Sequence, residues 1–270
     1  MKDIYYPTEH DRDCYNLKVI QCGDYIEVYK YTNCLIKTNR EPPKGNKKGH
    51  SILSNEAKLE NRKKYLNKAK NKIARLIKCN NDLEYFFTLT FAAEPTVEES
   101  KKKVNYFFSR LRKDYPGVKY LWVIERGGDY GEGRLHYHFL TNLKLDAAAF
   151  GNERYVKSEK HKEIERYFHK KYWKHGWVDI RRLNSEGIYN VSGYVSAYIT
   201  KSMLDMSLVN SKVYSHSNNL DKPIIDVYMT CDDAEDILAM GKNYNLNFSN
   251  SYSYFTDGVI NYFSFSPKEE

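Results

Sequence analysis

The chain has 270 residues, 41% of them hydrophobic, and its net charge of +8 corresponds to a pI near 9.0. This length fits one elaborated domain or two small domains around a sizeable core. No apolar run approaches the roughly 18 residues that a membrane span needs, and the first residues do not resemble a signal peptide. We therefore expect a globular cytoplasmic protein that neither crosses a membrane nor is secreted.

The five cysteines are spaced irregularly, and none belongs to a C-x-x-C pair. A zinc knuckle needs closely spaced pairs, and a disulfide framework needs an even number of cysteines in a short secreted chain. Free thiols in a reducing compartment are therefore expected at Cys14, Cys22, Cys34, Cys79 and Cys231.

Positive charge is concentrated in one segment of the chain. Between Lys37 and Lys78 there are fourteen basic residues and three acidic ones, so the remainder is slightly acidic. Such a field attracts a polyphosphate backbone and releases its counterions. The 25 tyrosines add surfaces on which unpaired bases can stack, although most rings are expected in the core. These features favour a nucleic-acid partner; the alternative is a solvated helix surface.

In chain order, the first predicted element is a β-hairpin over residues 15–36, which turns at Gly23-Asp24 and precedes a proline-rich loop. A helix is predicted from Ser54 to about Cys79, because apolar residues recur there on one stripe. Most of its basic residues lie away from that stripe. They form the candidate DNA-binding set: Arg62, Lys63, Lys64, Lys68, Lys70, Lys72 and Arg75.

Strands and helices alternate through the middle of the chain. Strands are predicted at residues 83–91, 118–126, 134–140 and 177–183. Helices are predicted from Thr96 or Glu94-Pro95 to the stop at Pro116-Gly117, at 159–174 and at 193–205. This order predicts the α+β class, with a central antiparallel β-sheet of about five strands and flanking helices in a ferredoxin-like arrangement. The helices are expected to pack on one face of the sheet.

Beyond Asp205 the pattern weakens, because Asn, Ser and Tyr dominate. Only short strands around residues 224–229 and 260–265 are predicted. The expected organisation is an N-terminal hairpin and basic loop over residues 1–53, a central domain over 54–205 that begins with the basic helix, and a C-terminal extension of unassigned role over 206–270.

Two imidazoles stand at alternate positions of the third central strand, so His136 and His138 emerge on the same face. Glu125 ends the preceding strand and is within reach, because facing or diagonal residues lie about 5 to 8 Å apart. Two imidazoles and a carboxylate suit Mg²⁺, Mn²⁺ or Zn²⁺ as a Lewis acid. Glu132 is a weaker third ligand. The alternative is an ordinary solvated strand, with Glu125 in a salt bridge.

The last predicted helix places Tyr194 and Tyr198 one turn apart, with Lys201 on the same ridge. A phenol can attack phosphorus when a cation stabilises its oxyanion, and a phosphotyrosine retains the energy of the broken bond. The alternative is an aromatic stripe that packs against the sheet.

Three segments, in this order, resemble the motifs of rolling-circle replication initiators, which are metal-dependent endonucleases with a histidine-hydrophobe-histidine motif. They are Thr88-Leu-Thr-Phe91, His136-Tyr-His138 and Tyr194-Val-Ser-Ala-Tyr198-Ile-Thr-Lys201. The tyrosine segment is most similar to the two-tyrosine form found in small single-stranded DNA phages and related plasmids. The resemblance covers residues 54–205 and implies an RRM-like palm that serves as a nicking endonuclease domain.

The resemblance also implies a metal site in which His136 and His138 bind Mg²⁺ or Mn²⁺ and Glu125 is the third ligand. The glycine-rich turn at residues 127–133 is longer than the tight connection expected from the family. This length loosens the expected placement of Glu125 relative to the histidines.

For the nucleophile, the resemblance implies that Tyr198 or Tyr194 attacks the scissile phosphodiester at a replication origin, with Lys201 near the metal or the phosphate. The products are a 5′-phosphotyrosine and a 3′-hydroxyl that primes a host polymerase, and the second tyrosine later releases a circle. The phosphate-binding motif G-x-x-x-x-G-K-[ST] is absent from the chain, so a host helicase is expected to separate the strands.

Two other functions fit parts of the pattern. Transposases and conjugative relaxases share the metal motif, but relaxases usually place the tyrosine before the histidines, whereas Tyr194 and Tyr198 follow them. A non-catalytic module that binds single-stranded nucleic acid would keep the sheet, the basic helix and the aromatic rings without a metal or a nucleophile.

Overall fold

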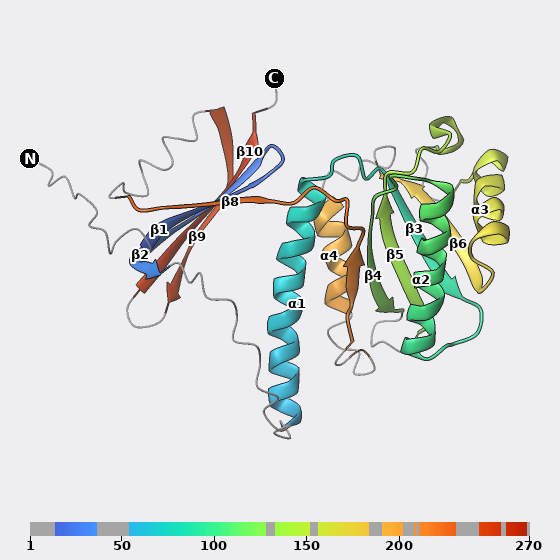
Figure 1. Ribbon diagram of the computed structural model, residues 1–270, viewed down its shortest axis with the longest axis horizontal. Coiled ribbons are helices and arrows are strands. Elements are labelled where there is room, and N and C mark those ends of the chain that lie inside the picture. The colour runs from blue at the N-terminus through green and yellow to red at the C-terminus, as the bar shows by residue number, and fades with distance from the viewer. Residues whose placement is uncertain are drawn as a thin grey trace, which may run out of the picture. The chain divides into compact units, whose positions relative to one another are not determined.

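The computed structural model divides the chain into two compact units, Leu53–Asp221 and a second unit that joins Met1–Ile52 to Lys222–Glu270. Each unit is built around its own sheet (Figure 1). The sequence carries no sign that the two ends share a unit, because pairing between distant strands leaves no local pattern. The residues described are 14–36, 54–127, 133–151, 156–183, 191–201, 208, 211–230, 243–254 and 258–268.

The larger unit contains a five-stranded antiparallel sheet in the order β6-β3-β5-β4-β7. Its strands are β3 (Tyr85–Phe91), β4 (Tyr120–Arg126), β5 (Leu135–Thr141), β6 (Gly176–Arg182) and β7 (Tyr214–His216). The first four have the strand order of a ferredoxin-like sheet, so the predicted α+β class is confirmed. The short strand β7 lies where the sequence predicted none, and it extends the sheet beside β4.

The described helices of this unit cover both faces of the sheet. They are α1 (Asn55–Lys78), α2 (Val97–Asp114), the 3-10 helix η2 (Ala147–Ala149), α3 (Glu159–Lys171) and α4 (Val191–Lys201). Helices α2 and α3 lie on one face, whereas α4 lies on the other with α1 packed against it (Figure 1). Within the described residues, no helix combines the length and apolar character needed to cross a bilayer.

The expectation that all helices pack on one face is therefore wrong, and the composition of β3 explains why. Phe87 contacts Phe168 of α3 on one side of the strand. Phe86 points the opposite way and contacts Tyr194 and Tyr198 of α4. Because consecutive residues of a strand face opposite sides, a continuously aromatic strand needs a cover on both faces.

Side chains cap the first turns of two helices, at the predicted start Ser54 and at Thr96, one of the two predicted starts of the next helix. The Ser54 hydroxyl accepts a hydrogen bond from the Ala57 amide at 3.2 Å and caps α1. Thr96 and Glu99 form a reciprocal capping box at the start of α2. Each arrangement satisfies amide groups that the first helical turn leaves without partners.

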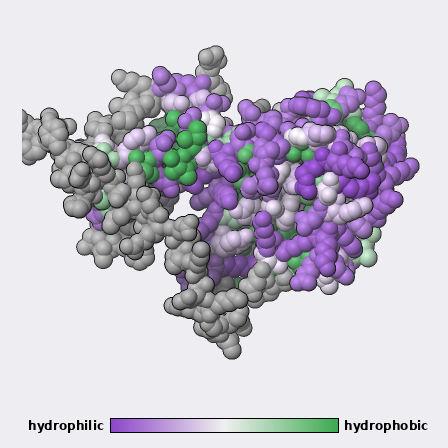
Figure 2. Space-filling model, viewed as in Figure 1, coloured by the Kyte–Doolittle hydropathy of each residue, from purple (hydrophilic) through white to green (hydrophobic). Residues whose placement is uncertain are grey.

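The smaller unit is a second antiparallel sheet in the order β8-β1-β2-β10-β9. Its strands are β1 (Cys14–Cys22), β2 (Tyr25–Ile36), β8 (Ile224–Tyr228), β9 (Tyr244–Tyr254) and β10 (Gly258–Pro267). The predicted hairpin is confirmed, and Gly23 in its turn has a φ of 59°, which favours glycine. On the face seen in Figure 2, hydrophobic residues gather on this unit. The exposed apolar side chains of the unit include Ile224 and Ile225 on β8 and Phe248 on β9.

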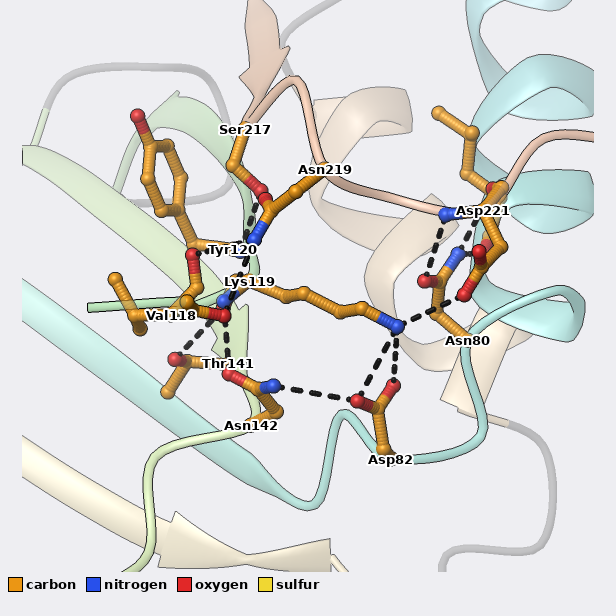
Figure 3. Close-up of polar contacts among 12 residues, drawn as sticks. Asn80, Asp82, Val118, Lys119, Tyr120, Thr141, Asn142, Ser217, Asn219 and Asp221 are labelled. Atoms are coloured by element: carbon orange, nitrogen blue, oxygen red, sulfur yellow. Dashed lines mark hydrogen bonds and ion pairs between the residues drawn. The ribbon is translucent and has the colours of Figure 1, made fainter. Parts of the chain in front are cut away.

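A polar cluster around Lys119, just before β4, fastens two connecting segments to the central sheet (Figure 3). The Lys119 ammonium lies 2.8 Å from Asp221, which follows β7, and 3.3 Å from Asp82, which follows α1. Asn80 binds the Asp221 backbone at its amide and its carbonyl, and Asn142 donates to Asp82. The cluster thus holds the chain beyond β7 against the start of β4.

The contact between β6 and β3 depends on Gly176. A Cβ at this position would lie 2.0 Å from the Thr90 carbonyl oxygen, so any side chain must push the two strands apart. We expect Gly176→Ala to lower the free energy of unfolding by about 2 kcal/mol. Urea denaturation followed by tryptophan fluorescence measures this, because Trp122, Trp173 and Trp177 all lie in the larger unit.

Gly151→Ala is the matched control, since a Cβ at Gly151 has no neighbouring atom within 4 Å. This change should alter stability by less than about 0.5 kcal/mol. Equal stabilities of the two variants would contradict the steric argument.

Candidate active site

The predicted metal ligands lie on the sheet face that α4 covers. Cross-strand register places Trp177, Thr90, His136 and Glu125 in one row across β6, β3, β5 and β4. Residues that pair directly in an antiparallel sheet project to the same side. The register therefore brings Glu125 and His136 together, and it adds two residues that the sequence had not indicated for this site.

A hydroxyl from β3 holds each imidazole. Thr90 Oγ1 lies 3.0 Å from His136 Nδ1, and Thr88 Oγ1 lies 3.0 Å from His138 Nδ1. A partner at Nδ1 fixes the orientation of the ring and directs Nε2 into the site. The sequence marked Thr88 and Thr90 only as part of a motif; their alternate positions on a strand could have shown that both face the histidines.

Glu125 and His138 form a buried pair beneath α4. Glu125 is only 4% exposed and His138 only 5%, and Glu125 Oε1 lies 3.0 Å from His138 Nε2. The second carboxylate oxygen, Oε2, is buried without a hydrogen-bond partner among the described residues. A buried oxygen without a partner costs about 1–3 kcal/mol, so this carboxylate is poorly satisfied by the fold alone.

The long glycine-rich turn does not disturb this placement. The Gly127 amide donates to the Arg134 carbonyl at 2.9 Å, and the Gly133 amide donates to the Gly127 carbonyl at 2.7 Å. These bonds close the hairpin at its base and keep β4 and β5 in register. Glu132, the weaker candidate for the third ligand, lies outside the described residues.

Two imidazoles and a carboxylate are chemically suitable donors for a divalent cation, although two of them are hydrogen-bonded to each other in this structure. Across the part of the chain described here, no three His, Cys, Asp or Glu side chains already surround a common metal position. The His138–Glu125 bond joins two of the expected donors directly. Two imidazoles oriented at Nδ1 and a carboxylate with an unsatisfied oxygen are suitable ligands once that bond opens.

The electrostatics of the site favour a neutral imidazole at His136. Burial lowers the pKa of His136, and the neighbouring His138 lowers it further, while Glu125 acts in the opposite direction. At neutral pH the ring is therefore uncharged and keeps a lone pair that can bind a metal ion.

Helix α4 brings the predicted nucleophiles onto the histidines. The ring of Tyr198 stacks on His138 with a centroid separation of 3.9 Å, and its hydroxyl donates to the Tyr194 hydroxyl at 2.8 Å. Burial raises the pKa of Tyr198 strongly, the bond to Tyr194 acts in the same direction, and the Arg181 charge opposes them. Lys201 ends α4, but its side chain is outside the described residues.

The predicted DNA-binding residues of α1 do not all share one environment. Lys63, Lys64, Lys68 and Lys72 are exposed, and Lys70 and Arg75 are partly buried. Arg62 is 7% exposed and donates to the Leu208 carbonyl at 2.6 Å, so its guanidinium is used inside the unit. The exposed lysines remain the candidates for phosphate contacts.

Comparison with known families connects this site to DNA replication. Residues 84–203 match the family model described as replication-associated protein ORF2. The match covers less than half of the chain, begins at the start of β3 and includes every candidate metal ligand and both tyrosines. No curated protein and no solved structure shows a significant match. The family match supports a replication-associated protein.

The pKa of His136 should depend on the neighbouring imidazole of His138. We expect His138→Gln to raise the pKa of His136 toward its ordinary value, because this change removes the unfavourable electrostatic interaction between the two imidazoles and leaves the burial in place. Proton NMR of the imidazole signals, recorded in EDTA between pH 4 and 9, measures the shift. An unchanged or lower His136 pKa would contradict the predicted coupling.

Proposed function

We propose that this protein is a replication initiator that nicks and rejoins single-stranded origin DNA through a tyrosine, with Mg²⁺ or Mn²⁺ as cofactor. The observation that carries the proposal is the stacking of Tyr198 on His138 at 3.9 Å. It puts a phenol and the expected metal donors on one face of the sheet. The match of residues 84–203 to a replication-associated family supports the same conclusion.

His136, His138 and Glu125 are the proposed metal ligands, and the hydroxyls of Thr88 and Thr90 hold the two rings in place. A bound divalent ion would act as a Lewis acid on a phosphate oxygen and neutralise charge that develops during attack. The Oε2 atom of Glu125 would gain most from a bound metal ion, because it has no hydrogen-bond partner among the described residues.

In the proposed reaction the Tyr198 oxygen bonds to the scissile phosphorus, and the bond from phosphorus to the 3′ oxygen breaks. The phenol loses one proton and the leaving oxygen gains one, so a 3′-hydroxyl and a 5′-phosphotyrosine result. No high-energy cofactor is consumed, and reversal of the step reseals a strand. A host polymerase would extend the 3′-hydroxyl, and a host helicase would open the duplex in the host cytoplasm.

The two tyrosines take different roles in this proposal. Tyr198 cuts first, because its ring contacts His138 directly. Its raised pKa keeps the phenol protonated at neutral pH, so attack requires a proton acceptor. The Tyr194 hydroxyl accepts the hydrogen bond that Tyr198 donates, so it can take this proton while it releases its own proton to water. Tyr194 then serves as the second nucleophile, which releases the circle after one round.

Two observations argue for this function over the alternatives. A relaxase or transposase would share the metal site, but the matched family is described as replication-associated. A non-catalytic binding module has no use for a buried carboxylate whose second oxygen lacks a described partner. A test for a covalent protein–DNA adduct distinguishes the proposed nuclease from the non-catalytic binding module.

A covalent adduct is the most direct test. The wild-type protein with Mn²⁺ should attach to a randomised pool of single-stranded oligonucleotides labelled at the 3′ end, and the labelled species should survive on a denaturing gel. Tyr198→Phe and His138→Ala should each reduce the adduct by about 100-fold or more, because nucleophile and metal act in the same step.

Tyr106→Phe is the matched control, because Tyr106 is an exposed tyrosine on α2, on the opposite side of the sheet. It should form the adduct like the wild type. An adduct that persists in the Tyr194→Phe, Tyr198→Phe double variant would contradict attack by either tyrosine. Binding of the pool without any adduct would leave the non-catalytic module as the function.

The exposed lysines of α1 should set the salt dependence of DNA binding. Changing Lys64, Lys68 and Lys72 together to glutamine removes three charges from one line of the helix. For a single-stranded oligonucleotide, the slope of log K against log salt should then fall in magnitude by about 2, because each lost phosphate contact contributes about 0.7. Fluorescence anisotropy at several salt concentrations measures the slope.

The control removes the same charge elsewhere in the unit. Lys102, Lys113 and Lys144 are exposed and lie outside α1. Their combined change to glutamine should leave the slope nearly intact. Equal losses in the two triple variants would show that only total charge matters and that α1 makes no defined contact.

A further inference from the structure

Trp177 is the one tryptophan of the chain that is exposed. Its side chain is 57% accessible at the start of β6, whereas Trp122 and Trp173 are 6% and 0% exposed. Leaving an indole in water forgoes a large gain from burial. Register places Trp177 opposite Thr90, in the row that continues to His136 and Glu125. The exposed ring therefore belongs to the candidate active-site face.

A cation accompanies this ring. The guanidinium of Arg134 lies over the Trp177 indole, 5.2 Å from the ring centroid. Arg134 precedes β5 and stands two residues before His136, so it projects on the same side of the sheet. The pair thus offers a flat aromatic surface and a positive charge side by side at the edge of the site.

We propose that Trp177 and Arg134 form a stacking platform for one base of the single-stranded DNA substrate, next to the phosphate that is cut. The inference rests on the proposed function and names how that substrate is held. Every base can stack on an indole, and an exposed Arg contributes both a cation–π contact and a charge for the adjoining phosphate.

The position of the platform suits this role. Trp177 and His136 are separated by two strand spacings, which is about 10 Å. One DNA strand that crosses the sheet can therefore place a phosphate at the histidines and an adjacent base on the indole. Because β6 is an edge strand of this sheet and Trp177 is 57% exposed, a base can reach the ring from solvent.

Binding of oligo(dT) tests the platform without the need for an origin sequence or catalysis. In EDTA, oligo(dT) should quench tryptophan fluorescence, and this change should come from Trp177 because the other two indoles are buried. Trp177→Ala should abolish the quench and raise the Kd by roughly 5- to 150-fold, the range expected for one lost stacking contact. Trp177→Phe should keep most of the affinity.

The chain offers a matched control pair on the opposite side of the sheet. Tyr106 of α2 is 61% exposed and has the Arg110 guanidinium 5.9 Å from its ring centroid. Tyr106→Ala should leave the Kd unchanged. Arg134→Gln should lower the salt slope by about 0.7 while the fluorescence quench persists.

The outcomes separate this inference from the proposed function. A wild-type Kd in Trp177→Ala, with or without lower thermal stability, would overturn the platform and leave nicking by Tyr198 untouched. Weak binding in Trp177→Ala, restored in Trp177→Phe, would support the platform. If the wild-type protein forms no adduct, the proposed nuclease fails, and the oligo(dT) measurements still decide whether Trp177 stacks on DNA.

Discussion

The strand register of the central sheet is the constraint on which the site depends. Side chains alternate along a strand, so a slip of one residue between β3 and β5 would turn Thr88 and Thr90 away from the histidines. The same slip between β4 and β5 would send Glu125 to the opposite face. Burial on both faces of the sheet prevents such slips, because any shift would move aromatic side chains out of their contacts. The hydrogen bonds at the base of the glycine-rich turn and the cluster around Lys119 fix the two ends of β4.

Packing on the second face of the sheet joins the two halves of the site. Phe86 of β3 contacts both tyrosines of α4 and also stacks on His138 at 5.5 Å. The contacts that hold α4 on the sheet are therefore the same contacts that place Tyr198 on His138. On the other face, Tyr137 between the histidines meets Ser100 of α2 at 2.9 Å. A polar aromatic residue suits this position of β5 because its hydroxyl finds a partner on the helix beyond. The stability of the unit and the placement of the proposed nucleophile consequently depend on the same core.

Local patterns predicted much of the larger unit, and long-range pairing accounts for what they missed. Recurring apolar residues predicted α1 from Ser54, and aromatic or β-branched runs marked β3, β4, β5 and β6. The alternation of His136 and His138 gave their shared face. Strands β7 and β9 lack such patterns, since Asn and Ser have low strand propensity, and they form because a neighbouring strand supplies a partner. The positions of Trp177 and Arg181 near the site follow from the pairing of β6 with β3, which the sequence alone does not indicate. The burial of Arg62 likewise depends on Leu208, a contact across 146 residues.

The environment of Glu125 shows that this face of the sheet is not arranged for stability alone. A carboxylate that is 4% exposed, with one oxygen on His138 and the other without a described partner, destabilises the fold relative to an apolar residue of similar size. The neighbouring Tyr198 phenol is also held in a form that resists ionisation. A cation placed among these side chains would bind the free carboxylate oxygen and lower the pKa of the phenol, because it stabilises a phenolate. The unsatisfied carboxylate and the phenol beside it therefore support the proposal that these residues hold a cation and that the chemistry takes place at the phenol.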